Sequence, residues 1–429
     1  MSQLYGVPPL PSGWVLRPLK YLAIPNAESL PDHHPPDEEI RYIDIGSVSR
    51  GGLVEEPEIL RFGDAPSRAR RILRSGDVLV SSVRTYLRAV MQADTDFDGY
   101  VASTGFSVLR PKRHVDPRYL YYWCMSDPFI ETVVSKSTGV SYPAISASEL
   151  TNLPVALPPT DMQRRVADML DAETARIDTL IEKNDAARQL AETKLREEIA
   201  TAVTLGLDTG GRRETGTTWA PEIHASWDWA PYQYFAELGS GHTPSRSRED
   251  LWMDCTIPWI TTADVKWLRD HRREFLDDTE HYVSEAGIAH SAARLLPART
   301  VVVSRTASVG FSAVMARAMA TSQDFFTWTC DEHRLLPEYL LYVLRAMKFR
   351  GHFDRLMYGS THKTIYFPDL VELRGPIPPV EDQRAIVDYV RKRSHPIHQL
   401  IDRVQQMNDS LRLRRQALIT AAVTGEIEV

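Results

Sequence analysis

Residues 157–206, LPPTDMQRRVADMLDAETARIDTLIEKNDAARQLAETKLREEIATAVTLG, decide the organisation of this chain because the sequence contains them twice. Residues 377–425 read IPPVEDQRAIVDYVRKRSHPIHQLIDRVQQMNDSLRLRRQALITAAVTG. A shift of 220 positions aligns the Pro-Pro pairs, the Gln-Arg pairs after them, and Ala202-Val203-Thr204 with Ala422-Val423-Thr424. This spacing is far above the roughly 20–50 residues of solenoid repeats. The chain is therefore a duplicated half-protein, and each half ends in a segment with a helical pattern.

The second copy has the sequence pattern of a coiled coil. Apolar residues occur at every seventh position, namely Ile397, Val404, Leu411 and Leu418. Such a stripe favours packing of one helix against another. The stripe of the first copy is less regular, because Asn184 and Arg188 interrupt it. Two similar helices in two similar halves pack most simply against each other, so we expect an antiparallel pair around a pseudo-twofold axis.

Prolines predict where these helices begin and break. Pro158-Pro159 and Pro378-Pro379 favour extended backbone, which places a stiff joint before each helix. Pro396 lies inside the second copy, and proline is tolerated in the first turn of a helix but not in its interior. We therefore expect a short helix and then a long helix in each copy, with a break near Ser394 in the second and near Thr174 in the first.

The sequence before each repeat predicts the same mixed unit of strands and helices. Stretches typical of strands occur at residues 42–45, 77–81 and 102–109, and a helix is expected from Tyr119. Residues 257–262 and 300–304 correspond in the second half to the first two of these strands. The elements recur in order, whereas the side chains between them differ.

The predicted fold class is α+β. We expect two similar mixed α/β domains joined by two long antiparallel helices that form a coiled coil, with a pseudo-twofold internal repeat. The expected boundaries place the first domain, the first helical segment, the second domain and the second helical segment at residues 1–157, 158–206, 207–377 and 378–429.

Composition and known motifs exclude several classes of protein. No apolar run approaches the ~20 residues of a membrane helix, and the N-terminus lacks the basic and apolar segments of a signal peptide. The three cysteines are scattered and indicate neither a disulfide framework nor a zinc site. The sequence also lacks GxxxxGK[ST], GxSxG and HExxH, and no Gly-rich cofactor loop follows a strand. We expect a cytoplasmic protein without membrane association and without catalytic machinery of its own.

The net charge of −7 argues at first against a nucleic-acid partner, since neutralised phosphates are the main source of affinity for nucleic acid. A basic patch can nevertheless lie on an acidic body. Arginines cluster in two runs, at residues 68–74 and 269–273. Each run fits either such a patch or an ordinary solvated face.

Several motifs resemble the specificity subunit of type I restriction–modification systems. They are Gly241-His242-Thr243-Pro244-Ser245, the stretch IPWITTADVK at residues 257–266, and the Pro-Pro and Ala-Val-Thr ends of the repeat. The similarity covers nearly the whole chain. The first half departs from the pattern, because it has no G-x-T-P-S near Trp14 and residues 42–45 replace the I-P-W-I-T strand.

This resemblance implies a prokaryotic, non-catalytic DNA-recognition subunit. Each domain would be a target-recognition domain that reads one half of a bipartite, asymmetric sequence in double-stranded DNA. The helix pair would space the two domains and dock two methyltransferase subunits, with restriction subunits added in the full complex. S-adenosylmethionine, ATP and magnesium would belong to those partners, so no cofactor or metal is expected in this chain.

Residues expected to contact DNA carry cationic, hydroxyl or aromatic side chains on loops, because such groups bind phosphates and base edges. One set follows the strands at 77–81 and 300–304: Arg84, Thr85, Tyr86, Arg88, Arg305, Thr306 and Ser308. The other set lies in the polar loops before the repeats: Lys136, Ser137, Thr138, Ser141, Tyr142, Ser360, Thr361, His362 and Lys363. Both sets could equally be ordinary surface loops.

A second function remains open from the sequence alone. The acidic net charge also suits a coiled-coil adaptor that binds protein partners through its two globular domains. Salt-dependent binding of a DNA duplex by the assembled complex would separate the two readings, because phosphate contacts weaken with salt.

Overall fold

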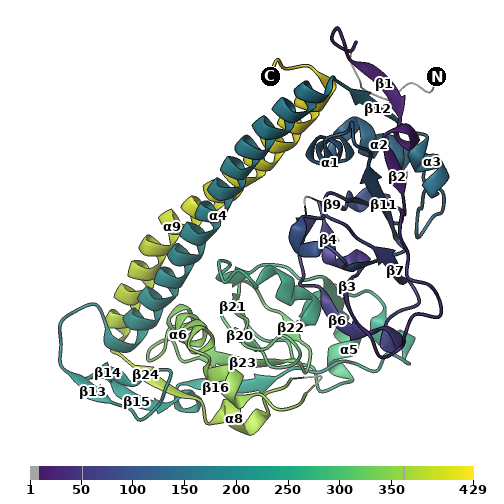
Figure 1. Ribbon diagram of the computed structural model, residues 1–429. Helices are drawn as coiled ribbons and strands as arrows, with labels where there is room; N and C mark the ends of the chain where they lie inside the picture. The colour runs from purple at the N-terminus through teal and green to yellow at the C-terminus, as the bar shows by residue number, and fades with distance from the viewer. Residues whose placement is uncertain (1–8, 51, 361–362) are drawn as a thin grey trace. The chain divides into compact units, whose positions relative to one another are not determined.

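The computed structural model describes residues 9–50, 52–360 and 363–429 (Figure 1). The chain divides into two compact units. Unit 1 comprises Met1–Asn184 and Gln406–Val429, and unit 2 comprises Asp185–Gln405. Each unit therefore contains one mixed α/β domain together with a segment of each of the two long helices.

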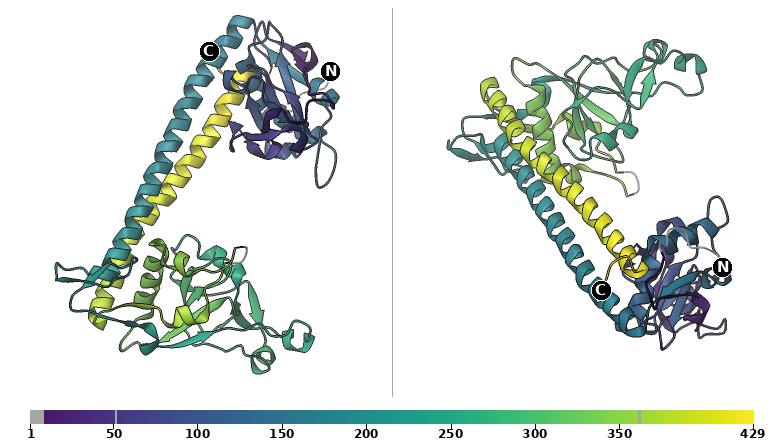
Figure 2. Two further views of the ribbon diagram at one scale, coloured as in Figure 1. Left: turned by 60° about the horizontal axis from the view of Figure 1, so that its bottom comes forward. Right: turned by 90° about the horizontal axis from the view of Figure 1, so that it is seen from above.

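The long helices are α4 (Thr160–Leu205) and α9 (Val380–Thr424). Each begins directly after its Pro-Pro pair, as the sequence predicts. Each ends at a glycine with φ of 78°, Gly206 and Gly425, a left-handed conformation that glycine adopts without steric cost. Within each unit the segments of α4 and α9 lie side by side (Figure 2), so the predicted antiparallel helix pair is confirmed.

The predicted division of each copy into a short and a long helix is wrong. Ser394, Pro396 and Thr174 all lie inside continuous helices. Proline in a helix interior costs about 3 kcal/mol, but packing on both sides of Pro396 holds the helix in place. Val390 and Ile401 are buried in the turns before and after it. The carbonyl group of Lys392, which loses its amide partner, belongs to an exposed residue and can bind water.

The domain of unit 1 has two four-stranded sheets. One sheet has the order β2-β11-β8-β9, with β2 (Ala23–Pro25), β11 (Phe106–Pro111), β8 (Val78–Ser81) and β9 (Val90–Gln92). The other has the order β6-β3-β10-β7, with β6 (Glu58–Arg61), β3 (Glu39–Ile43), β10 (Val101–Ser103) and β7 (Ala69–Ile72). The predicted strand at residues 102–109 is thus two strands in different sheets. The strand predicted at 42–45 ends at Ile43, because Asp44 caps the 3-10 turn Ile45–Ser47.

Helices and short strands complete this domain. Helix α1 packs on β8 and β9, and β1 pairs antiparallel with β12 beside the start of α4. The bounds of the remaining elements are β1 (Val15–Pro18), β4 (Val48–Ser49), β5 (Gly52–Leu53), β12 (Pro154–Leu157), α1 (Pro117–Met125), α2 (Asp127–Lys136) and α3 (Ala147–Thr151). The core of the unit includes Leu170 from the start of α4 and Val423 from the end of α9. Both long helices are therefore part of the hydrophobic core.

The domain of unit 2 repeats this plan with a larger first sheet. Its order is β16-β23-β20-β21-β18, with β16 (Ala236–Ser240), β23 (Phe325–Cys330), β20 (Val301–Ser304), β21 (Ser312–Met315) and β18 (Phe275–Leu276). The second sheet has the order β19-β17-β22, with β19 (His281–Val283), β17 (Ile257–Ile260) and β22 (Ala320–Thr321). Helix α6 packs on β20 and β21, as α1 does on its sheet in unit 1.

The other elements of unit 2 are short, except for α6, and one strand pair among them repeats a pair of unit 1. Strand β15 pairs with β24 as β1 pairs with β12. The bounds of the remaining elements of unit 2 are β13 (Arg212–Glu214), β14 (Glu222–His224), β15 (Asp228–Pro231), β24 (Arg374–Ile377), α5 (Glu285–Ala289), α6 (Pro337–Phe349), α7 (His352–Leu356) and α8 (Phe367–Val371).

In the described parts of the chain, no helix combines the length and apolar character that crossing a membrane requires.

The duplication extends to individual hydrogen bonds. The hydroxyl group of Tyr119 donates to the carbonyl oxygens of Ala156 and Val423. The hydroxyl group of Tyr339, 220 positions later, donates to those of Pro376 (3.3 Å) and Val203 (3.0 Å). In each unit a buried tyrosine thus joins the last strand of the domain to the end of the long helix that comes from the other half of the sequence.

The glutamine after each Pro-Pro pair makes an equivalent repeated contact. The side chain of Gln163 donates to the carbonyl of Pro158 at 2.9 Å and accepts from the amide of Asp116 at 2.9 Å. Gln383 donates to the carbonyl of Pro378 at 2.8 Å and accepts from the amide of Leu336 at 2.7 Å. Each glutamine fastens the start of a long helix to the residue just before α1 in unit 1 or α6 in unit 2. The Pro-Pro-x-x-x-Gln motif is therefore structural.

Candidate nucleic-acid interface

In unit 1, the loop after β8 and the loop after α2 form one continuous surface. The amide of Arg84 donates to the carbonyl of Pro143 at 2.7 Å. The hydroxyl groups of Thr85 and Ser137 are hydrogen-bonded at 2.8 Å. The guanidinium group of Arg84 stacks over the ring of Tyr142, with 4.6 Å to its centroid. The two sets of residues that the sequence singles out in the first half are therefore neighbours.

Unit 2 brings the equivalent loops together. The amide of Ala307 donates to the carbonyl of Lys363, and the amide of Ile365 donates to the carbonyl of Arg305, both at 2.9 Å. Thr306 forms an isolated antiparallel bridge with Thr364, as Val83 does with Ala144 in unit 1. Thr361 and His362, which the sequence also singles out, lie outside the described residues.

The loops after β8 and β20 share an unusual backbone conformation. Arg84 and Arg88 have φ of 48° and 56°, and Ala307 and Gly310 have φ of 61° and 86° at the corresponding places. Left-handed backbone is costly for residues other than glycine and is found most often at functional sites. The neighbouring loop holds this conformation through the backbone bonds of Arg84 and Ala307. The two halves thus preserve the loop shape although the side chains differ.

Exposure separates the candidate residues into two groups. The exposed ones can contact a ligand directly, and they are Arg84, Tyr86, Lys136, Thr138, Ser141, Tyr142, Ser360 and Lys363. Half-buried ones are Arg88, Ser137, Arg305, Thr306 and Ser308. Thr85 is only 2% exposed and supports the loop through Ser137.

Two of the candidate arginines have partners inside the protein. Arg88 forms an ion pair with Asp127 at the start of α2. Arg305 donates from Nε to the carbonyl of Gln323 at 2.8 Å and from Nη1 to that of Ile365 at 3.2 Å. In this structure both guanidinium groups therefore position the loops, while Arg84 and Lys136 remain exposed.

Sequence reasoning missed several exposed aromatic residues beside the loop of unit 2. Tyr358 and Tyr366 flank that loop, and their rings lie 5.3 Å apart. Both are more than half exposed, and Phe367 follows them on the surface. Aromatic faces of this kind can stack on bases. The sequence feature that could have predicted them is the presence of an aromatic residue on each side of the polar stretch 359–364.

Sequence reasoning also missed a basic hollow in unit 1. Arg50, Arg412 and Arg415 line a space of about 520 Å³ between the β4–β5 hairpin and the two long helices. Arg415 is paired with Asp178 at 3.0 Å. No local sequence pattern predicts this hollow, because its arginines come from two segments more than 350 positions apart.

The first of the two arginine runs is part of an internal ion-pair network. Arg74 pairs with Glu28 at 2.7 Å, and Arg110 contacts both Glu28 and the buried Asp77. The hydrogen bonds from Arg74 and Arg110 lower the pKa of Glu28 to about 2. Arg68 pairs with Asp44 at 2.9 Å. These contacts favour the structural reading of this run over a nucleic-acid patch.

The motifs that carry the resemblance are also structural. The backbone at Gly241 lies so close to Thr321 that a Cβ atom would be 1.8 Å from the carbonyl oxygen. The buried carboxylate of Asp264 accepts from the amides of Thr261 and Glu280, both at 2.7 Å. Lys266 pairs with Glu280. Asp264 and Lys266 therefore hold the turn after β17, and Gly241 allows the backbone after β16 to approach β22 closely.

No cluster of three His, Cys, Asp or Glu side chains able to hold a metal ion occurs within residues 9–50, 52–360 and 363–429.

Comparisons with known proteins agree with the duplicated architecture. A family model described as type I restriction modification DNA specificity domain matches residues 38–187 and 232–402. The type I restriction enzyme HindI specificity subunit of Haemophilus influenzae is 20% identical over 375 residues, which cover 75% of this chain and 80% of that subunit. The MjaIX specificity subunit of Methanocaldococcus jannaschii is 25% identical over 165 residues, 38% of this chain and 37% of that subunit.

Two solved structures share the fold. A chain from a study of complex assembly and conformational transition of the type I R-M system is similar with a TM-score of 0.75 at 24% identity, covering 98% of this chain and 100% of that one. The crystal structure of the HsdS subunit from Thermoanaerobacter tengcongensis is similar with a TM-score of 0.50 at 24% identity, covering 99% and 100%.

Proposed function

This chain belongs to the type I restriction modification DNA specificity domain family, and from that premise we propose that each unit contacts one half of a two-part DNA target. The family function is DNA sequence specificity within a type I restriction–modification complex. We assign DNA sequence specificity in this chain to two loop surfaces, one in each unit, which would contact the bases.

The observation that carries this proposal is the repeated meeting of two loops. In both units a left-handed turn after an inner strand, β8 or β20, is bonded to the loop between two short helices, α2 and α3 or α7 and α8. The backbone plan is common to both, whereas Arg84 and Pro143 in one unit correspond to Ala307 and Lys363 in the other. A common scaffold with different side chains suits two domains that read different half-sites.

We propose that α4 and α9 set the spacing of the two half-sites and dock methyltransferase subunits. A protein that reads two half-sites selects their separation through the element that connects its reading domains. Both helices enter the hydrophobic core of each unit, which supports a connection by structured helix. Exposed leucines on α4 and α9 offer apolar contact to a partner, and they are Leu180, Leu190, Leu400 and Leu413.

In this proposal the chain is non-catalytic and carries no cofactor. S-adenosylmethionine, ATP and magnesium would be bound by the methyltransferase and restriction subunits of a cytoplasmic, prokaryotic complex. The absence of catalytic motifs from the sequence supports this division of labour. Methylation by the purified chain alone would contradict it.

The direct test is co-expression with the cognate methyltransferase subunit, followed by sequencing of methylated bases. We expect adenine methylation in one bipartite motif. If residues 207–376 are exchanged for the equivalent domain of a relative, only one half of the motif should change. A soluble complex that methylates no bipartite motif, or an exchange that alters both halves, would contradict the proposal.

A further inference from the structure

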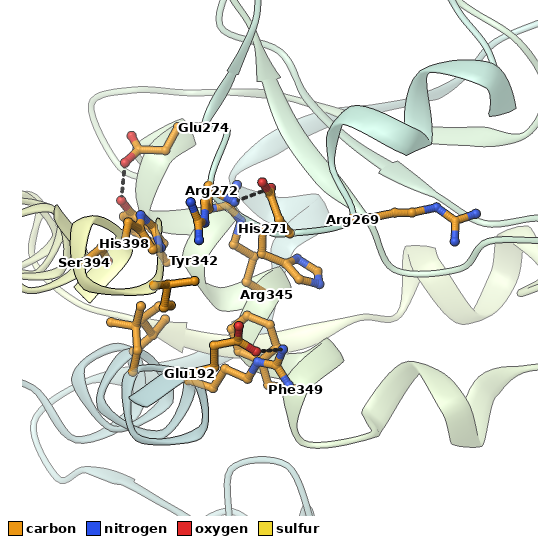
Figure 3. Close-up of a pocket in the computed structure, with 15 residues that line it drawn as sticks. Glu192, Arg269, His271, Arg272, Glu274, Tyr342, Arg345, Phe349, Ser394 and His398 are labelled. Carbon is orange, nitrogen blue, oxygen red and sulfur yellow. Dashed lines mark hydrogen bonds and ion pairs between the residues drawn. The ribbon is translucent and has the colours of Figure 1, made fainter. Parts of the chain in front are cut away.

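A hollow in unit 2 lies where α4 and α9 meet helix α6 and the loop before β18 (Figure 3). Its volume is about 210 Å³. Its charged lining residues are Glu192, Arg196, Arg269, Asp270, Arg272, Glu274 and Arg345. The hollow is separate from the loop surface of this unit, to which none of these seven residues belongs.

The guanidinium group of Arg345 is the unusual feature of this hollow. Arg345 is 3% exposed, and its Nε atom has no hydrogen-bond partner among the residues that the structure describes. Its Nη2 atom donates to the carbonyl of Arg273. Within the described part of the chain no carboxylate forms an ion pair or hydrogen bond with it; burial lowers its pKa, and the more distant charges of Glu274 and Asp270 offset this only in part. A buried charge without a counter-ion is strongly destabilising.

The internal repeat shows that the fold does not need this charge. A shift of 220 positions aligns Arg345 with Met125, and likewise Tyr342 with Tyr122. Met125 is 3% exposed at the end of α1, so its environment is equally buried. An apolar side chain therefore fills the same position in the other half of the protein. The arginine requires a reason other than packing.

The acidic groups around the hollow are already engaged with other partners. Glu274 accepts from Arg391 at 2.8 Å and from the hydroxyl group of Tyr342. Glu192 pairs with Arg188 at 3.0 Å, and Asp270 accepts from the amide of Arg272 at 3.0 Å. Glu192 and Glu274 are labelled among the lining residues in Figure 3, and the bonds that hold these carboxylates do not involve Arg345.

His271 adds a second buried nitrogen atom. Its Nδ1 atom is enclosed and forms no hydrogen bond with any residue in the described ranges. The residue has φ of 55°, so a strained backbone presents this ring to the hollow. Burial and the neighbouring Arg345 lower its pKa to about 3. The ring is therefore neutral at pH 7 and can still donate one hydrogen bond from Nδ1 or Nε2.

We propose that this hollow binds a small oxyanion of the phosphate type through the guanidinium group of Arg345. Guanidinium presents parallel N–H donors that match two oxygens of a phosphate or carboxylate. The His271 ring would add a donor, and Arg272 and Arg196 would add positive charge. Because the lining residues come from α4, α6, α9 and the loop before β18, the anion would fasten this domain to the helix segments of its own unit.

The test compares the full-length chain with its Arg345→Met variant, which copies the residue of the other half. Binding is measured by thermal shift and calorimetry with inorganic phosphate, against chloride at the same ionic strength. The wild-type protein should bind phosphate saturably. Arg345→Met should bind phosphate more weakly by about tenfold or more, because a charge-assisted contact is lost. Arg355→Met, which removes an exposed charge from the same unit, should bind phosphate as the wild type does.

Several outcomes would overturn the proposal. They are no phosphate binding by the wild-type protein, equal binding by Arg345→Met, or an equal loss in Arg355→Met. Without phosphate, Arg345→Met should unfold at the same temperature as the wild type or higher, because an unpaired buried charge has been removed. A clear loss of stability would show that the protein itself satisfies Arg345. Binding of acetate but not of phosphate would overturn the assignment of a phosphate-type ligand.

Discussion

The side-chain amide of Asn184 on α4 donates a hydrogen bond of 2.8 Å to the side-chain oxygen of Asn408 on α9. Both residues belong to unit 1. The 220-residue shift aligns Asn184 with Val404 and Asn408 with Arg188, so the repeat does not reproduce this pair. A polar pair in a helix seam opposes shifted pairings, which would leave an amide buried without a partner. The hydrogen bond with Asn408 thus explains why Asn184 interrupts the apolar stripe of the first copy.

Replacement of Asn408 by leucine should destabilise unit 1 by about 1–3 kcal/mol, because the amide of Asn184 loses its partner. The double variant Asn184→Leu, Asn408→Leu should recover most of this loss, while helix pairing becomes less specific. Urea unfolding followed by helical circular dichroism measures the first effect, and mass photometry detects extra oligomers. Additive losses in the double variant would contradict a coupled pair.

Replacement of Pro396 by alanine should stabilise unit 2. The proline lies inside α9 and removes one backbone hydrogen bond there, and the penalty for proline in a helix interior is about 3 kcal/mol. Thermal unfolding and hydrogen exchange of the amides around residue 396 measure the gain. Ser394→Ala serves as a control for helix propensity. An unchanged stability would mean that the helix breaks at this proline in solution.

Replacement of Arg84 by glutamine should weaken DNA binding by the complex with its methyltransferase. Arg84 is exposed on the loop after β8, so removal of its charge should reduce the slope of log K against log salt by about 1 if it contacts a phosphate. Fluorescence anisotropy with a duplex at several salt concentrations measures both quantities. Arg113→Gln removes an exposed charge elsewhere in unit 1 and should change neither. Equal effects of the two variants would remove Arg84 from the interface.

Acid should destabilise unit 1 through Glu28. Arg74 and Arg110 lower the pKa of this carboxylate from 4.5 to about 2. Since the folded-state pKa is depressed, the stabilisation is present above about pH 4.5 and is lost as the pH falls towards 2. Glu28→Gln should therefore lower the unfolding temperature at pH 6, and its difference from the wild type should vanish near pH 2. Glu58→Gln, at an exposed position, should show no such difference at either pH.

The sequence predicted much of the architecture because the duplication repeats local signals. The Pro-Pro pairs, the heptad stripe and the strands near Val78 and Val301 depend on steric preferences and periodicity, which neighbouring residues determine. The prediction of a helix break near Pro396 was wrong because it rested on local propensity alone. Local propensity opposes a helix there, but Val390 and Ile401 are buried on either side of it, and tertiary packing outweighs the penalty.

For the candidate interface, the sequence identified the loops but not their relationship. It singled out the loops at Arg84 and Tyr142 separately, and only the folded chain brings the guanidinium group over the ring. It could not show that Thr85 is buried or that Arg88 faces Asp127, because burial depends on residues far away in the chain.

By itself, the sequence determined that this protein is built from two related halves and that long helices end each half. This was possible because a sequence repeat and a regular spacing of apolar residues depend only on the order of residues in the chain. Only the tertiary structure decided which charges are satisfied. Arg74 pairs with Glu28 and Arg88 with Asp127. Arg345, at the position where the other half has Met125, is buried and forms no ion pair with any described residue. Whether a charged side chain has a counter-ion depends on which residues lie near it in the folded protein, and no local pattern in the sequence encodes that.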